Sequence, residues 1–305
     1  MSFTALWDSN RIRSCFFVIS CALFTTITNA DETDFSPELF AFQTGFANAE
    51  SQSPADLVDL VAESGFDGVE LMGLGQVERF MPHLKRRGLK LYSLYLKLDV
   101  DRPDQPVDPN WGSVLEKYGE DLNAVWFHVH SQKYGRSDPA GDAECVAILR
   151  KLSGEVAPLG IQIGIYHHVG LWAEKFSDAV RVARQVDRKN VGAVFNLCHY
   201  LKMNGPQQLE SDLRDAFPQV ALVSINGADD GETKSMGWDR LIQPLDRGSF
   251  DVKRVLRSLA KRIPRPDWFA RLRNTRETRR LFSAISCGLS SDVGKGKRLA
   301  GLSHS

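Results

Sequence analysis

The sequence predicts an α/β protein, a (β/α)8 barrel of the TIM type in which the eighth β/α unit is degenerate or missing. Short apolar runs alternate with longer amphipathic stretches seven times from about residue 38, with no linker between them. Strands that alternate with helices in this way pair in parallel through right-handed crossovers. The chain of 305 residues has the length of one such barrel, and apolar strands such as VGAVF suit a parallel sheet covered on both faces.

The predicted strands are short apolar runs, and the predicted helices carry recognisable start and stop signals. The strands span residues 39–46, 68–72, 89–98, 124–130, 161–168, 191–197 and 220–226. Ser53 at the N-cap and Pro54 at the first position open the first helix. Gly88 stops the second helix, and Pro158 with Gly160 closes the fourth. The helices span residues 54–63, 76–87, 111–120, 142–157, 175–186, 206–216 and 250–261.

The eighth unit does not follow this pattern. After the last helix the chain reads IPRPDW over 263–268, where two prolines oppose a central strand. Residues 263–305 form a basic, atypical tail whose Ser/Gly-rich end has the composition of a disordered segment, and a helix over 266–282 is one alternative. Either the barrel is open, the gene product is altered by a frameshift near residue 260 or by truncation, or another segment closes the barrel.

The N-terminal residues predict a secretory signal peptide. An uncharged, mostly apolar run over 15–26 follows two arginines, and small residues end the segment at Ala30. The run is shorter than a membrane span, although a buried helix or a retained anchor is an alternative. We expect residues 1–30 to be removed on export to the periplasm or the cell exterior, with no stable membrane insertion afterwards. Residues 31–262 then form the barrel.

Composition and cysteine content exclude several classes of protein. The 38 basic and 38 acidic side chains balance, so the chain lacks the net attraction that a nucleic-acid binder needs. Beyond the leader only Cys145, Cys198 and Cys287 remain, without CxxC spacing, which argues against a disulfide framework and a structural zinc site. No Gly-rich phosphate loop follows the first strand, which disfavours a dinucleotide-binding sheet.

Histidines gather at the carboxyl ends of the predicted strands, where parallel barrels carry their active sites. Five of the seven histidines lie there: His128, His130, His167, His168 and His199. His128 and His130 are two residues apart on one strand and face the same way. His168 and His199 end adjacent strands, so their rings can approach each other. Together with the carboxylate of Glu70, such imidazoles are suitable ligands for zinc, manganese or a similar divalent ion.

Each of these strand-end residues receives a predicted role. Glu70 or His199 takes a proton, and His168 and His199 are the metal ligands if zinc, manganese or magnesium binds. The candidate substrate-binding residues are Lys97, His128, His130, Tyr166, Asn196 and Asn226. For Lys97, an ordinary surface lysine is an equal alternative to a cation that faces the substrate. Tyr166 and Trp172 offer a stacking face for a sugar, although aromatic residues beside strand ends more often belong to the core.

The chain resembles the xylose isomerase-like TIM barrel family, also called sugar phosphate isomerases/epimerases, which includes endonuclease-IV-type enzymes. The resemblance runs from about residue 39 to 260 and rests on three motifs. They are GFDGVEL over 65–71, YHH over 166–168 and FNLCH over 195–199. It implies a divalent metal held by carboxylates and histidines on the barrel rim. It also implies proton transfer between adjacent carbons of a keto- or aldo-sugar.

The chain departs from the family's pattern at its acidic ligands. Tyr166 stands where the pattern has Glu, and Asn196 stands where it has Asp. Ser224 replaces a histidine of the seventh strand, and the last metal-binding Glu belongs to the eighth strand. The residues that match the pattern are Glu70, His168 and His199. Because two anionic ligands are replaced by neutral side chains, tight binding of a hard divalent cation is in question.

Two functions remain in competition. The first is an exported sugar isomerase or epimerase that acts on a keto- or aldo-sugar by proton transfer at the barrel rim, with a divalent metal as its implied cofactor. The alternative is a non-catalytic or degenerate carbohydrate-binding barrel, which the absent acids and the missing strand favour. Cleavage of abasic-site DNA is disfavoured by export, by the zero net charge and by too few carboxylates. The expected partner is therefore a small-molecule carbohydrate, and no nucleic acid.

Overall fold

The computed structural model describes residues 39–43, 53–243, 245 and 247–260. All of the described residues belong to one compact unit of the chain. The predicted signal peptide, the predicted tail over 263–305 and the alternative helix over 266–282 lie outside the described residues. No helix of the described part is long and apolar enough to cross a bilayer.

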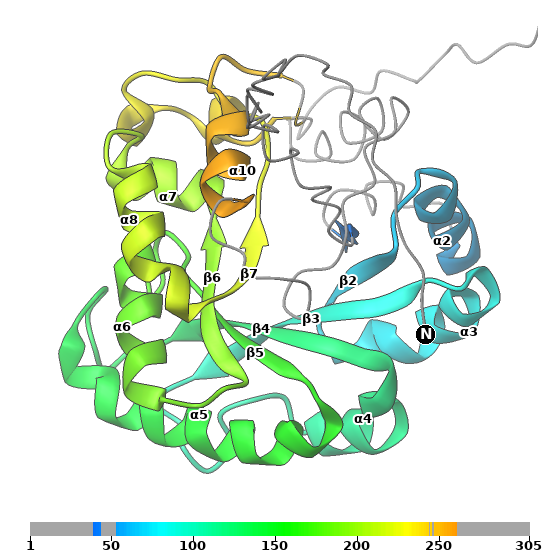
Figure 1. The fold of residues 1–305 in the computed structure, drawn as a ribbon. Helices are drawn as coiled ribbons and strands as arrows, with labels where there is room; N and C mark the ends of the chain where they lie inside the picture. The colour runs from blue at the N-terminus through cyan, green and yellow to red at the C-terminus, as the bar shows by residue number, and fades with distance from the viewer. Residues whose placement is uncertain (1–38, 44–52, 244, 246, 261–305) are drawn as a thin grey trace, which may run out of the picture. The chain divides into compact units, whose positions relative to one another are not determined.

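Within the described residues, seven parallel strands form one sheet in which the strands pair in chain order. The strands are β1 (Phe40–Phe42), β2 (Gly68–Met72), β3 (Lys90–Asp99), β4 (Leu122–His130), β5 (Gln162–Tyr166), β6 (Val191–Asn196) and β7 (Val220–Ser224). The sheet curves as a barrel wall does, and its helices lie on the outer side (Figure 1). The predicted parallel barrel architecture is confirmed for these seven units.

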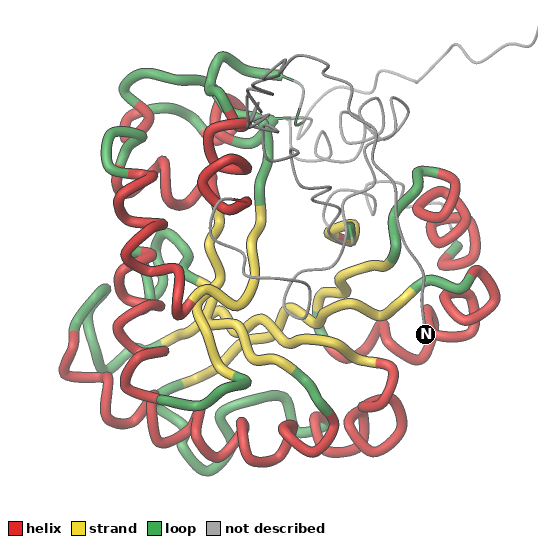
Figure 2. The backbone as a smooth tube through the Cα atoms, viewed as in Figure 1, coloured by secondary structure: helices red, strands yellow, loops and turns green. Residues whose placement is uncertain are grey.

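The helices form an outer layer around the strands (Figure 2). The helices that follow the first five strands are α2 (Pro54–Glu63), α3 (Val77–Arg87), α4 (Trp111–Tyr118), α5 (Asp142–Val156) and α6 (Phe176–Val186). The later helices are α7 (Leu197–Asn204), α8 (Leu209–Ala216), α9 (Trp238–Leu241) and α10 (Val252–Ala260). Each predicted helix has a counterpart within a few residues of its expected bounds, and α7 and α9 were not predicted.

The local signals in the sequence act as expected. The Ser53 hydroxyl accepts the backbone N–H of Asp56, and the Asp56 carboxylate accepts the backbone N–H of Ser53, which makes a capping box before Pro54. Gly88 adopts a left-handed conformation with φ 65° and ends α3. These contacts satisfy backbone groups that helix ends otherwise leave unpaired.

The unpredicted helix α7 begins directly after β6 because Asn196 caps it. The Oδ1 atom of Asn196 accepts the backbone N–H of His199 at 3.0 Å, which satisfies one donor of the first turn. The helix predicted over 206–216 consequently begins only at Leu209. Asn is a favoured N-cap residue, but Asn196 also lies at the end of a predicted strand. Its capping role is therefore not evident from the sequence.

Two apolar clusters hold the sheet. The larger lies between the outer side of the sheet and the helices, and includes Phe80, Leu149 and Phe195. The smaller lies on the inner side; its buried members are Ala124, Trp126, Tyr166, Val194, Ala221 and Leu222. Because the inner cluster is rich in aromatic rings and carries polar atoms, it differs from the purely aliphatic filling of many barrels.

Candidate functional site

Several predicted site residues stand in rows across the inner side of the sheet. Lys97 of β3 lies opposite His128 of β4, and His128 lies opposite Tyr166 of β5. At the carboxyl end of the next strand pair, Asn196 lies opposite Ser224. Alternate residues of a strand face the same side, so these rows bring side chains from β3 to β7 onto one surface. This surface is the candidate site.

His168 and His199 form an imidazole pair beside this surface. Their ring centroids are 4.1 Å apart, as expected for histidines that follow adjacent strands. The Nδ1 atom of His168 donates to the carbonyl oxygen of Val169 at 2.8 Å, which leaves Nε2 of a neutral ring as an acceptor. The ring of Tyr166 lies 5.6 Å from that of His199 in an edge-on arrangement. The pair therefore has one side against an aromatic ring.

Burial keeps the imidazole of His199 uncharged. The residue is 7% exposed, and its buried Nδ1 has no hydrogen-bond partner. Desolvation, with repulsion from His168 and His167, lowers the pKa of His199 to about 2. Burial also lowers the pKa of His168. The pair is therefore neutral at ordinary pH, and a neutral imidazole can accept a proton.

Asn196 and His167 position His199. Besides capping α7, the Oδ1 atom of Asn196 accepts the Cys198 thiol at 3.0 Å, and its Nδ2 donates to the Ser224 hydroxyl at 3.1 Å. The backbone N–H of Asn196 donates to Nε2 of the fully buried His167 at 3.2 Å. Both polar atoms of the Asn196 amide are engaged within the protein. Its predicted role in substrate binding stays a prediction, whereas its structural role is evident.

A second pair of imidazoles, His128 and His130, lies on β4. Nδ1 of His128 and Nε2 of His130 are 2.7 Å apart, so one ring donates a hydrogen bond to the other. The ring of Tyr95 stacks on His128 with centroids 4.4 Å apart. Burial, with repulsion from His130, His168 and Lys97, lowers the pKa of His128 to about 3. The sequence prediction that the two rings share a face is confirmed, and they also contact each other.

Lys97 is held by its own strand. Its Nζ lies 2.9 Å from a carboxylate oxygen of Asp99, and its side chain is 54% exposed. The ion pair compensates the charge of Lys97, which lies opposite His128 in the sheet. A role for Lys97 in binding substrate stays a prediction.

Glu70 lies deeper than the rim position expected for it. It sits in the middle of β2 and is fully buried, where it accepts the Ser93 hydroxyl at 3.0 Å while its Oε1 has no partner. A register shift after Val69 places Glu70 opposite Ser93. Burial raises the pKa of Glu70 well above its usual value, which favours the protonated form of the carboxyl group.

Aromatic rings line the inner side between Glu70 and the histidines. Tyr166 packs edge-on against Tyr95 at 5.3 Å and stacks on Trp126 at 5.7 Å. The buried indole Nε1 of Trp126 has no hydrogen-bond partner. Burial, with the nearby Cys198, Tyr95 and Glu70, raises the pKa of Tyr166 well above its usual value, so its phenol keeps its proton. Sequence reasoning missed Tyr95 and Trp126, although both alternate with strongly apolar positions of their strands.

Trp172 and Asn226 both make structural contacts. Trp172 belongs to the outer core, as aromatic residues beside strand ends more often do: it is 2% exposed, and its indole donates to the carbonyl of Asp138 at 3.0 Å. Asn226 lies beyond the end of β7, and its Nδ2 donates to the carbonyls of Gly227 and Leu241, each at 2.6 Å. The amide N–H groups of Asn226 therefore fasten the loop after β7, and its predicted role in substrate binding stays a prediction.

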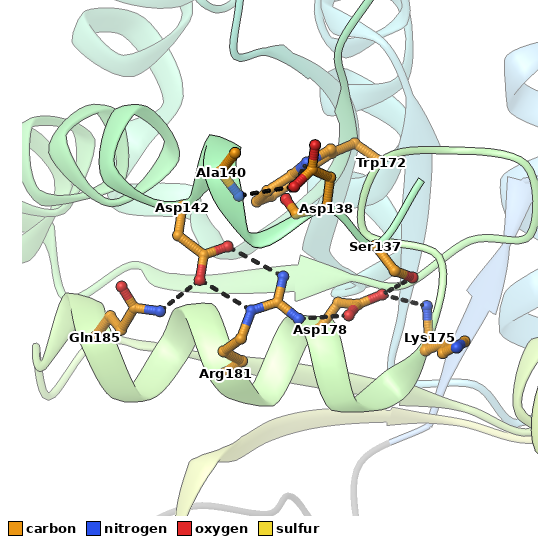
Figure 3. A network of polar contacts seen from close by, with 9 residues as sticks. All are labelled: Ser137, Asp138, Ala140, Asp142, Trp172, Lys175, Asp178, Arg181 and Gln185. Atoms are coloured by element: carbon orange, nitrogen blue, oxygen red, sulfur yellow. Dashed lines mark hydrogen bonds and ion pairs between the residues drawn. The ribbon is translucent and has the colours of Figure 1, made fainter. Parts of the chain in front are cut away.

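A polar network outside the barrel fixes the loops that follow β4 and β5 (Figure 3). Arg181 of α6 donates to both carboxylate oxygens of Asp142, at 2.9 and 3.0 Å, and to Asp178 at 2.6 Å. The other oxygen of Asp178 accepts the hydroxyl of Ser137 at 2.6 Å and the backbone N–H of Lys175 at 2.8 Å. The loop that carries His168 is thereby tied to α6.

Comparison with known proteins assigns the fold to a family. The profile of the xylose isomerase-like TIM barrel family matches residues 58–269, which is more than half of the chain. The chain belongs to the xylose isomerase-like TIM barrel family. The resemblance read from its motifs is thus confirmed. No curated protein sequence matches the chain.

Solved structures of similar fold include enzymes with different reactions. The probable 3-DHS dehydratase AsbF from Bacillus anthracis has 15% identity and a TM-score of 0.56, covering 82% of this chain and 97% of its own. A D-allulose 3-epimerase from Methylomonas sp. has 13% identity and a TM-score of 0.56, covering 82% and 96%. The IOLI protein with a bound zinc atom has 17% identity and a TM-score of 0.55, covering 81% and 94%. At these identities the likeness establishes the fold and leaves the reaction open.

The donor set of this member of the xylose isomerase-like family does not fit a divalent metal. In the described part of the chain, no three His, Cys, Asp or Glu side chains are grouped so that they could hold a metal ion. Around His168 and His199, the phenol of Tyr166 keeps its proton and Oδ1 of Asn196 already accepts two hydrogen bonds. Two neutral imidazoles alone lack the charge and the number of ligands that such ions need.

Proposed function

We propose that the chain is a sugar isomerase or epimerase that moves a proton between adjacent carbons of a keto- or aldo-sugar on the inner side of the barrel. One observation carries the proposal. His199 is a neutral, buried imidazole that Asn196 and His167 hold beside His168 and Tyr166. A neutral imidazole can accept a proton from carbon, and a neighbouring phenol can donate a hydrogen bond to the oxygen that becomes negative during enolisation. Membership of the xylose isomerase-like family supports the same class of reaction.

The proposed chemistry needs a group that accepts the proton from carbon and a group that stabilises the carbonyl oxygen. A ring nitrogen of His199 takes the proton from the carbon next to the sugar carbonyl. The electron pair of that C–H bond forms the enediol double bond, and the carbonyl oxygen gains the electrons of its former π bond. The phenol of Tyr166, whose ring lies 5.6 Å from that of His199 and which burial keeps protonated, is the donor available to stabilise that oxygen. Protonation of the former carbonyl carbon, with transfer of the proton of the neighbouring hydroxyl group, completes isomerisation, whereas return of a proton to the original carbon on its opposite face completes epimerisation.

The test is solvent exchange into a sugar by the purified protein. D-fructose and D-psicose are incubated in D₂O, and deuterium at the carbons beside the carbonyl is followed by NMR and mass spectrometry. We expect exchange by the wild type and a loss of about 100-fold or more in His199→Phe, which keeps an aromatic ring but removes the base. His83→Gln on α3 is the matched control and leaves exchange unchanged. Exchange that persists in His199→Phe contradicts the assignment.

A non-catalytic carbohydrate-binding barrel is the second candidate. The observation that favours it is the neutral pair Tyr166 and Asn196 at positions where the family's pattern has acids. Binding of a sugar without any deuterium incorporation, with or without added manganese, zinc or magnesium, would select this candidate over the first. The two functions therefore separate in a single set of samples.

We also propose that the protein acts after export. The apolar run over 15–26, which ends in small residues at Ala30, supports this proposal. Expression of the full chain in a bacterial host, followed by N-terminal sequencing of the periplasmic fraction, tests it. A mature chain that begins near Asp31 is the expected result, whereas an intact leader on cytoplasmic protein contradicts it.

A further inference from the structure

The connection that follows β7 is firmly attached to the barrel. Over residues 225–243 it folds back on itself through an antiparallel bridge between Gly227 and Gln243. Asn226 ties the start of this connection to Leu241, at the end of α9. The buried hydroxyl of Thr233 donates to the carbonyl of Leu201 on α7 at 2.7 Å. We call residues 225–243 the β7 connection; its contacts fix it against the helix that carries His199.

The β7 connection places the indole of Trp238 next to His199. The ring centroids of Trp238 and His199 are 5.3 Å apart, and the planes meet at 73°. Lys202, one turn along α7 from His199, has its ammonium group 5.7 Å from the centre of the indole and donates to the carbonyl of Met236 at 2.6 Å. Two residues of α7 therefore hold the position of Trp238.

Trp238 nevertheless remains 40% exposed. The described residues expose four large apolar side chains, which are Leu60, Met72, Leu159 and Trp238. Within this group, Trp238 is the one with a ring contact to a histidine of the candidate site. A rigidly held, exposed aromatic ring beside a buried polar group can bury further apolar surface at little entropic cost when a ligand binds.

We propose that Trp238 is a sugar-stacking residue, whose indole packs against the apolar C–H face of a carbohydrate while the polar groups of the ligand reach His168 and His199. The class of ligand rests on the proposed function. The assignment of Trp238 adds a binding contact from outside the strands. Stacking on an aromatic ring gives orientation without charge, which suits a ligand that must present one C–H bond to a neutral base.

Binding, rather than turnover, tests this inference. Isothermal titration of the full-length protein with D-fructose and D-psicose compares the wild type with Trp238→Ala and Trp238→Phe. We expect a weakening of about tenfold or more in Trp238→Ala, and a smaller loss in Trp238→Phe, because a benzene ring retains part of the stacking surface. Trp111→Phe is the matched control, since Trp111, the first residue of α4, is buried and its indole donates to Glu155. It leaves affinity unchanged.

A second measurement needs no variant. Hydroxyl-radical footprinting of the wild type, read by peptide mass spectrometry, reports the exposure of Trp238 with and without sugar. We expect oxidation of Trp238 to fall when sugar is present, and oxidation of Leu159 to stay constant. A Trp238→Ala protein that binds sugar like the wild type, or unchanged oxidation at saturating sugar, overturns the inference.

The outcomes also separate this inference from the proposed function. Sugar binding that depends on Trp238, in a protein without deuterium exchange, supports the stacking role and contradicts the isomerase proposal. Deuterium exchange that has the same rate and the same dependence on sugar concentration in Trp238→Ala as in the wild type supports the isomerase proposal and overturns the stacking role. A wild type that binds neither sugar counts against both.

Discussion

The histidines of the site are unusual because burial lowers their pKa values while few carboxylates oppose that effect. His199, His128 and His167 have pKa values lowered to about 2, 3 and 3, respectively, with desolvation as the largest cause. Glu70 is shifted in the opposite direction, which also favours its neutral form. Burial therefore favours the neutral form of each of these groups, and they offer few fixed charges to a ligand on the inner side of the sheet.

These shifts predict that the protein loses stability in mild acid. In the unfolded chain a histidine titrates near pH 6.5, so below that pH the unfolded state binds protons that the folded state refuses. Stability from each buried histidine is therefore present above about pH 6.5 and decreases towards the folded pKa, by about 1.4 kcal/mol per pH unit. Urea unfolding at pH 7, 6, 5 and 4 measures this loss.

The same experiment on His199→Phe gives the residue-level test. We expect a flatter dependence of unfolding free energy on pH between about pH 6.5 and 4, because one buried histidine no longer titrates. Glu70 acts in the opposite sense: its proton stabilises the folded state below the unfolded pKa, and that stability is lost as pH rises through the folded value. A variant with the wild-type pH slope would contradict this, because it would show that His199 has the same pKa in the folded and unfolded states.

Restoring two acids predicts a gain of metal binding. In Tyr166→Glu/Asn196→Asp, two carboxylates join His168 and His199, which gives four ligands with negative charge. We expect added Mn²⁺ or Zn²⁺ to raise the melting temperature of this double variant, because a ligand that binds the folded state stabilises it. The wild type is expected to show no comparable shift.

The gain should depend on the histidines. His168→Gln in the background of the double variant removes one ligand and is expected to abolish the metal-dependent shift in melting temperature. A shift of equal size in the wild type would contradict the conclusion that its donor set does not fit such an ion.

At the scale of elements, the ion pairs of the helices differ greatly in burial. Arg181 lies between Asp142 and Asp178, whose side chains are 9% and 3% exposed (Figure 3). Arg214 and its neighbour Asp215 form a pair that is 55% and 74% exposed. Exposed pairs contribute little to stability, whereas removal of one partner from a buried group leaves a charge without compensation.

Arg181→Met is therefore expected to destabilise the protein by about 3 kcal/mol, because two nearly buried carboxylates lose their counter-ion. Arg214→Met is the matched control and should change the unfolding free energy by less than about 0.5 kcal/mol. Urea denaturation monitored by circular dichroism measures both. Equal effects of the two substitutions would mean that the network in Figure 3 is no more than a surface feature.

Elements with a clear apolar pattern or a local capping signal could be predicted from the sequence. Elements that depend on tertiary contacts could not. β2 and α2 match their expected bounds because an apolar run and a capping box specify them locally. Helix α7 escaped notice because its cap, Asn196, is also the last residue of a strand. Helix α9 has four residues, and its Trp238 contacts His199 and Lys202 of α7, which no local pattern in the sequence reveals.

The candidate site divides in the same way. The pairing of His168 with His199 follows from strand order, so the sequence could place both rings at one location. The depth of Glu70 depends on a register shift between β2 and β3, which a single sequence does not encode in readable form. Trp238 reaches His199 from the β7 connection, about forty residues away, so only the folded chain brings the two together.

At the scale of the whole described unit, one continuous outer core joins elements from both halves of the sheet. Cys145 of α5 and Cys198 of α7 both belong to it, and both are buried free thiols. Burial raises the pKa of Cys145 and raises that of Cys198 to about 12, so neither thiol reacts readily while buried. The two thiols can therefore report how the sheet opens.

We predict that the two cysteines become reactive in the same unfolding event. If the strands and outer helices unfold together, labelling by a thiol reagent at pH 8 in low urea should increase with the same urea dependence at both positions. Peptide mass spectrometry reads each cysteine separately in the wild-type chain. Much faster labelling of Cys198 at zero urea would instead mean that α7, and with it His199, opens locally. Such local opening would mean that the proposed base does not keep a fixed position. The rate of deuterium exchange into the sugar would then change with urea concentration below the unfolding transition.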